Sequence, residues 1–189
     1  MDLLDCHRRA LARTEELVSH VAPDRLGAPT PCPGWDVLAL MNHLVLGNRM
    51  YAWCARGRSG HDFDVHRDFV GDDPVEAFLS SARDIDRALA DPAVLERPFE
   101  LRYGRIPGAD AVAIHVMELV AHGWDLARAT GQPLGMAPDI VETALAARLP
   151  GDAHGPGRPL ADRVAVAGDA EPLDRLVAGL GRDPAWAPA

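Results

Sequence analysis

The sequence predicts an all-α protein, a bundle of four main helices followed by a small C-terminal appendage. Three observations carry this prediction. Long segments within the first 150 residues repeat apolar side chains at helical spacing. Prolines and glycines cluster between those segments and separate one helix from the next. A length of 189 residues, with 48% hydrophobic and 25% charged residues, is typical of one ordinary globular domain.

The first two helices are joined by a stiff connection. Residues 2–21 form the first expected helix, because leucine, valine and alanine recur there at helical spacing. Prolines and glycines between residues 23 and 34 then indicate a non-repetitive connection. The second helix is expected to start near Trp35 and Asp36 and to end near Gly57. Its apolar residues are dense, which predicts that it is largely buried.

A capping signal opens the third helix. The sequence DPVE (73–76) combines an N-cap aspartate, a proline at the first helical position and an acid at the third. We therefore expect a helix from this point to about Ala90. Residues 96–108 alternate and turn, which fits a short hairpin or an extended crossover.

The last elements of the bundle follow this turn. Asp110 is expected to cap a fourth helix that ends at Gly131, where glycine suits the left-handed C-cap position. A shorter fifth helix is expected from Pro138 to about Leu149. These elements define residues 1–150 as the helical bundle.

Residues 151–189 are expected to form a linker and a small appendage packed on the bundle. The stretch GDAHGPGRP (151–159) is a linker by composition. Beyond it, DRVAVAG (162–168) predicts a short strand and EPLDRLVAGLG (171–181) predicts a short helix.

A stripe of polar residues on the fourth helix is the main chemical signal. With about 100° per residue, His115, Glu118, His122 and Asp125 fall within a stripe roughly 60° wide. Glu118 and His122 lie one turn apart and can bind one divalent ion, with His43 of the second helix as a third ligand. Zinc takes such ligands, and catalytic sites keep a fourth position open. His115 and Asp125 would then support the ligands, Asp125 by holding the free ring nitrogen of His122.

The same stripe has simpler interpretations. Polar residues along one face are often the solvent side of a helix, and a lone histidine such as His43 is often a hydrogen-bonded core residue. Apolar residues flank the stripe on both sides, however, which predicts a buried helix whose charges need partners or a metal ion. The spacing alone therefore leaves both interpretations open.

Composition excludes several classes of function. The net charge is −9 and the pI is about 5.3, so no basic footprint for nucleic acid is present. All 19 basic residues are arginine, which removes a Schiff-base or P-loop lysine. No serine-elbow or glycine-rich nucleotide motif stands between a strand and a helix.

Targeting and cysteine signals favour the cytoplasm. The N-terminus has no apolar signal core, and no run approaches the roughly 20 apolar residues of a membrane span. The three cysteines lack the spacing of a disulfide framework or a zinc ribbon. Cys32 in TPCPGW is interpreted as a small residue in a tight proline loop rather than as a catalytic thiol. Apolar helix faces left uncovered would allow a homodimer.

Two long motifs and the C-terminus resemble a known family. TPCPGWDVLALMNHLVLGNRMYA, HVMELVAHGWDLARATGQP and the closing AEPLDRLVAGLGRDP are similar to the actinobacterial metal-binding branch of the DinB-like superfamily. That branch is related to the N-terminal domain of mycothiol-dependent maleylpyruvate isomerase. The resemblance implies a DinB-like four-helix bundle holding one divalent ion, expected to be zinc. The ligand positions of the family fall on His43, Glu118 and His122.

The resemblance also implies a class of activity. It points to an enzyme that uses a small-molecule thiol, mycothiol, on an electrophilic substrate, in isomerase or S-transferase chemistry. The isomerase has a substantial C-terminal α/β domain, for which residues 158–189 are too short, so its reaction is not carried over. Arg49 and Arg128 are near enough in sequence to be tested as substrate contacts.

The alternatives are a non-catalytic bundle with a structural metal or an interaction role, and a metal-free bundle with an internally satisfied stripe. A fourth protein ligand, with His115 the first candidate, would favour a structural metal.

Overall fold

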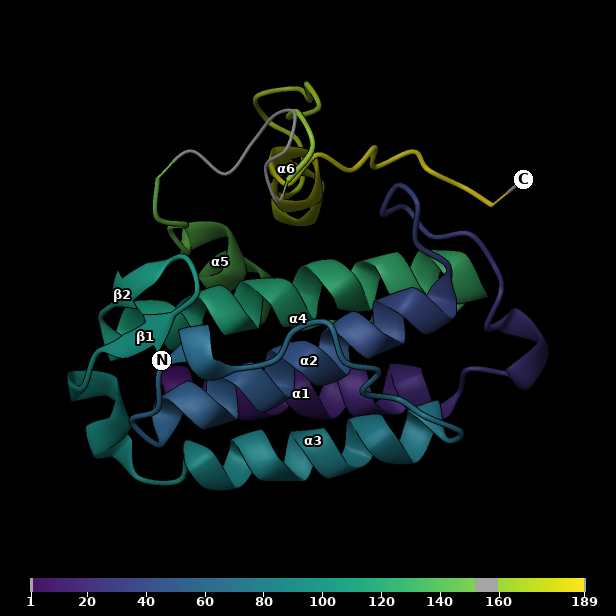
Figure 1. The fold of residues 1–189 in the computed structure, drawn as a ribbon. Coiled ribbons are helices and arrows are strands. Elements are labelled where there is room, and N and C mark those ends of the chain that lie inside the picture. The colour runs from purple at the N-terminus through teal and green to yellow at the C-terminus, as the bar shows by residue number, and fades with distance from the viewer. Residues whose placement is uncertain (1, 152–159, 189) are drawn as a thin grey trace.

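The computed structural model describes residues 2–151 and 160–188, and it confirms an all-α bundle with a small appendage (Figure 1). In this part of the chain α1 packs against α3 and α4, and α2 packs against the same two helices. The bounds of the four bundle helices are α1 Leu3–Ser19, α2 Val37–Ala55, α3 Pro74–Ala88 and α4 Gly108–Thr130.

The predicted helix starts follow from local capping. Asp36 precedes α2, and its carboxylate accepts a hydrogen bond of 2.8 Å from the backbone N–H of Ala39. Asp73 caps α3 in the same way, accepting from the N–H of Glu76 at 3.0 Å. Each carboxylate satisfies a backbone donor that has no partner within its helix.

The prediction that Asp110 caps α4 is wrong. The helix begins earlier, at Gly108, and its N-cap is Pro107, so Asp110 lies in the first helical turn. Gly108 packs under the 3₁₀ turn η3 (Pro92–Glu96), where a Cβ atom would lie only 2.4 Å from the carbonyl oxygen of Val94. A glycine therefore permits a close approach that sequence rules for capping do not anticipate.

The hairpin expected between residues 96 and 108 is present. Strands β1 (Phe99–Leu101) and β2 (Gly104–Ile106) pair antiparallel, with Phe99 opposite Ile106. Phe99 and Leu101 are buried, which fixes the hairpin to the bundle. The turn between the strands contains Tyr103.

The C-terminal appendage lies over the α4 side of the bundle (Figure 1). Helix α5 (Pro138–Ala146) contacts α1 and α4, and α6 (Pro172–Gly179) contacts α5. The strand predicted over 162–168 is not formed. Instead the backbone N–H of Val164 donates to the carbonyl oxygen of Ala178 at 3.0 Å, so this segment is held against the end of α6. The predicted linker, apart from residue 151, lies outside the described residues.

Helix α4 is the centre of the core, because it is buried on almost every side. Its apolar residues contact α1, α2 and α5, which confirms the burial inferred from the sequence. His115 of α4 is held by polar and ring contacts to two neighbouring helices. Its Nδ1 atom shares a hydrogen bond of 2.8 Å with Nε2 of His7 on α1, and the ring of Tyr51 on α2 stacks on it. None of the helices described here is both long and apolar enough to cross a bilayer.

We predict that unfolding stability falls with acidity through His7. Burial, and then the charge of Arg8, lower the pKa of His7 to about 4, whereas an unfolded histidine titrates near 6.5. The unfolded chain therefore binds the proton first, so stability is complete above about pH 6.5 and declines as the pH falls toward 4. The loss from this residue is about 3 kcal/mol.

Urea unfolding at several pH values between 4 and 7.5 measures this loss. His7→Gln should flatten the decline, whereas His61→Gln, at an exposed position of the 3₁₀ helix η2 (Gly60–Asp62), should leave it as in the wild type. Equal pH dependence in all three proteins would contradict the assignment to His7.

Candidate functional site

A cavity of about 400 Å³ opens where α2, α4, the hairpin and the appendage meet. Its wall is mostly apolar, and its side chains come from segments far apart in the sequence. The apolar side chains include Trp35, Met117, Leu149, Leu160 and Leu180. The polar side chains are Cys32, His43, Tyr103, Glu118, His122 and Arg182.

All three sequence-predicted ligands line this cavity. The rings of His43 on α2 and His122 on α4 meet edge to face, with centroids 4.7 Å apart. Trp35 covers both rings, with centroid distances of 4.7 Å to His43 and 6.0 Å to His122. Glu118 lies against the backbone of α2, since a Cβ on Gly47 would be 3.6 Å from its Oε2 atom.

The three side chains share a wall without forming a closed cluster. Among residues 2–151 and 160–188, no group of three or more histidine, cysteine, aspartate or glutamate side chains is gathered as a metal site. Glu118 has no hydrogen-bond partner in the same part of the chain. The donor types nevertheless suit a divalent ion, namely two imidazoles and one carboxylate facing a common space.

Burial sets the protonation of these groups. It lowers the pKa of His43 to about 3, an effect to which His122 adds. It also lowers the pKa of His122, although the hydrogen bond that His122 donates to Asp125 opposes this shift. Burial also raises the pKa of Glu118 to about 7, which the charge of Arg182 partly offsets. Both imidazoles are therefore neutral near pH 7, the form in which histidine donates a lone pair to a metal.

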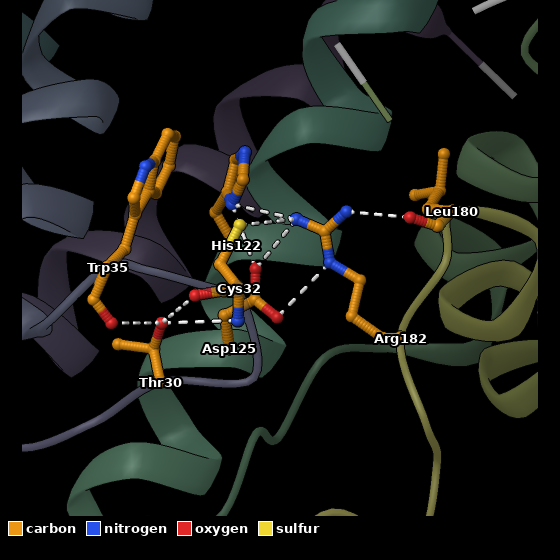
Figure 2. A network of polar contacts seen from close by, with 7 residues as sticks. All are labelled: Thr30, Cys32, Trp35, His122, Asp125, Leu180 and Arg182. Carbon is orange, nitrogen blue, oxygen red and sulfur yellow. Dashed lines mark hydrogen bonds and ion pairs between the residues drawn. The ribbon is translucent and has the colours of Figure 1, made fainter. Parts of the chain in front are cut away.

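His122 is oriented by a buried ionic network (Figure 2). Its Nδ1 atom hydrogen-bonds to Oδ2 of Asp125 at 2.9 Å, the contact that the helical spacing predicted. Asp125 is fully buried and also accepts from Arg182, at 3.0 Å from Nη2 and 3.3 Å from Nε. With the proton of His122 held at Nδ1, its Nε2 atom keeps the free lone pair.

Arg182 connects this network to the appendage. It follows α6, donates from Nη1 to the carbonyl oxygen of Leu180 at 2.9 Å, and reaches Sγ of Cys32 at 3.5 Å (Figure 2). Burial raises the pKa of the Cys32 thiol although Arg182 opposes the shift, so the thiol stays protonated. Cys32 thus belongs to the cavity wall, which its interpretation as a loop residue did not include.

Several other sequence-predicted candidates lie away from the cavity wall. His115 is bonded to His7 and sandwiched between aromatic rings, so it supports the helix behind Glu118. Arg49 contacts Ser80 and Asp84 on α3.

Arg128 also lies outside the cavity. It donates to the carbonyl oxygen of Pro184 at 2.9 Å and covers the ring of Trp124. Arg182 and Tyr103 are the polar wall residues that sequence reasoning missed. Tyr103 lies in a hairpin turn and carries no motif. Arg182 lies after α6, within the stretch AEPLDRLVAGLGRDP that resembles the family, and that stretch is the signal that could have pointed to it.

We predict that Arg182→Met is strongly destabilising. The substitution leaves the carboxylate of Asp125 buried with only His122 as a partner, and breaking a buried ion pair on one side costs about 3–5 kcal/mol. Urea unfolding compares this variant with Arg175→Met, an exposed position on α6 where little change is expected. Similar losses for the two variants would show that the Arg182 pair does not hold the site together.

The fold and the cavity define a class of protein: a helical bundle with a pocket to which two central helices contribute histidines and a carboxylate. Comparison with known proteins narrows the class. Residues 7–127 match the family described as the mycothiol maleylpyruvate isomerase N-terminal domain. The chain belongs to this family.

Two further comparisons give relatives in sequence and a likeness of fold. Uncharacterized proteins from two strains of Mycobacterium tuberculosis are 34% identical over 186 residues, covering 96% of this chain and 98% of each relative. The crystal structure of the mycothiol-dependent maleylpyruvate isomerase superposes with a TM-score of 0.57 at 15% identity. It covers 77% of this chain and 67% of the other, a likeness of fold that agrees with the DinB-like bundle.

Proposed function

We propose that this chain is a metal-dependent enzyme that uses a small-molecule thiol of the mycothiol class on an electrophilic substrate, in an isomerase or S-transferase reaction. One observation carries the proposal. His43, Glu118 and His122, from two helices, face a single cavity in a member of the mycothiol maleylpyruvate isomerase N-terminal domain family.

The residues fit a divalent ion by their chemistry. His43 and His122 are neutral, Nε2 of His122 is left free by the bond from Nδ1 to Asp125, and the Glu118 carboxylate faces the same space. These three side chains would hold the ion, expected to be zinc, and would leave its other positions to ligands. When bound, the ion would favour the thiolate form of a thiol at an open position.

The remaining wall residues prepare the cavity for an organic ligand. Trp35 covers the two histidine rings, and leucines from the segment after α5 and from the appendage also line the cavity. Such a wall excludes water and strengthens the polar contacts inside it. Asp125 fixes the tautomer of His122, while Arg182 balances the charge of Asp125.

Metal content is the first test. We expect about one zinc ion per chain after reconstitution of the full-length protein. His43→Ala and His122→Ala should each lose the ion because each removes a nitrogen donor, and Glu118→Gln should lose it because a neutral amide replaces the carboxylate. His61→Gln, at an exposed position, should retain it. Elemental analysis after dialysis gives the stoichiometry. Wild-type protein without bound zinc would contradict the proposed metal site.

Turnover is the second test, carried out with mycothiol and the zinc-loaded protein. We expect either isomerisation of maleylpyruvate, followed by its change in absorbance, or transfer of the thiol to monochlorobimane, followed by fluorescence. Glu118→Gln should reduce the rate to that of the reaction without protein, and His61→Gln should not. Bound zinc without turnover of either compound would instead support a non-catalytic metal-binding bundle.

A further inference from the structure

Two tyrosine hydroxyls meet at the edge of the cavity. The Tyr51 hydroxyl on α2 and the Tyr103 hydroxyl in the hairpin turn are 2.6 Å apart, a short hydrogen bond. Tyr51 is 1% exposed, whereas Tyr103 is 43% exposed and lines the cavity together with Glu118. One phenol of the pair is thus sealed inside the bundle, and the other faces the ligand space.

The burial of Tyr51 sets the direction of this hydrogen bond. In the described residues the Tyr51 hydroxyl has a single hydrogen-bond partner, the oxygen of Tyr103. If Tyr103 were the donor, the Tyr51 hydrogen would be buried without an acceptor, which costs about 1–3 kcal/mol. Tyr51 therefore donates and Tyr103 accepts, which leaves the hydrogen of Tyr103 available to the cavity.

The hairpin holds Tyr103 firmly in this place. Phe99 and Leu101 of β1 are buried, and the carbonyl oxygen of Glu100 accepts a hydrogen bond of 3.4 Å from the thiol of Cys54. Gly60 packs so closely that a Cβ there would lie 2.8 Å from the same oxygen. The turn that carries Tyr103 is thus fixed to α2 and to the loop after it.

We propose that Tyr103 is a substrate-binding residue whose hydroxyl donates a hydrogen bond to a carbonyl oxygen of the electrophile. Accepting from Tyr51 polarises the Tyr103 hydroxyl and strengthens it as a donor. The ligand class that fits has an apolar body, for the wall of Trp35 and leucines, and a ketone or similar oxygen at the hairpin edge. The inference deepens the proposed function, on which it rests for treating the cavity as the electrophile site.

Binding of two matched probes to the full-length protein tests this proposal without any turnover. Benzalacetone carries a carbonyl group beside an apolar ring, and β-methylstyrene is a similar hydrocarbon without the oxygen. We expect Tyr103→Phe to weaken benzalacetone binding about fivefold in a calorimetric titration, as the loss of one neutral hydrogen bond predicts. Binding of β-methylstyrene should not change, whereas a merely structural role of Tyr103 would weaken both probes equally.

Tyr51→Phe is the matched control, because it removes the same atom from the buried partner. It should weaken benzalacetone binding less than Tyr103→Phe does, since Tyr103 keeps its hydrogen. In the wild type, the carbonyl carbon of bound, isotope-labelled benzalacetone should shift downfield in the NMR spectrum, and Tyr103→Phe should remove that shift.

The outcomes separate this inference from the proposed function. Tyr103-dependent binding of benzalacetone in a protein without thiol turnover would support the inference and reject the proposed activity. Turnover with mycothiol, together with equal effects of Tyr103→Phe on both probes, would support the proposed activity and reject the role of Tyr103. Stronger benzalacetone binding in Tyr51→Phe would mean that Tyr103 donates to Tyr51, and this would overturn the proposal. No saturable binding of benzalacetone to the wild type would also overturn it.

Discussion

A buried carboxylate on α4 constrains the rest of this structure. Asp125 has no exposed surface, and an isolated charge in such a place would cost several kcal/mol. Its oxygens are shared between the ring of His122 and the guanidinium of Arg182. One partner lies on the same helix and the other lies 57 residues away. The pairing therefore decides both how His122 is presented to the cavity and where the C-terminal segment lies.

This arrangement makes the appendage part of the site. Leu160 and Leu180 close a cavity whose other wall belongs to α2 and α4, and Arg182 reaches beneath them to Asp125. Without the appendage, the cavity that holds His43, Glu118 and His122 would lose this part of its wall. The sequence predicts a helical bundle over residues 1–150 and a linker with a small appendage over residues 151–189. In the described residues the appendage also forms part of the wall of the cavity that holds the three predicted ligands.

The sequence was sufficient for the helices and for the polar stripe, because both depend on local periodicity. Glu118, His122 and Asp125 share one face of α4 through the 3.6-residue repeat alone. The start of α4 was misjudged, since Gly108 is required by contact with a distant turn. The strand expected over 162–168 failed for a related reason. A segment with an alternating pattern forms a strand only where a second strand can pair with it, and here the neighbour is the helix α6.

The site was less accessible to sequence reasoning where partners come from separate elements. Tyr103 carries no motif, and Arg182 lies in a family-like stretch that does not say what it contacts. The importance of both residues arises from Tyr51 and Asp125, which lie far from them in the chain. In each pair the buried residue, Asp125 or Tyr51, determines which hydrogen-bonding groups of its partner remain free. Asp125 occupies the guanidinium of Arg182, which therefore cannot serve as a free cation for a substrate. Tyr51, by contrast, has only one hydrogen to give and leaves that of Tyr103 free. The cavity thus offers an incoming electrophile a neutral donor at the hairpin edge, in the same cavity as the histidines and carboxylate that suit a metal ion.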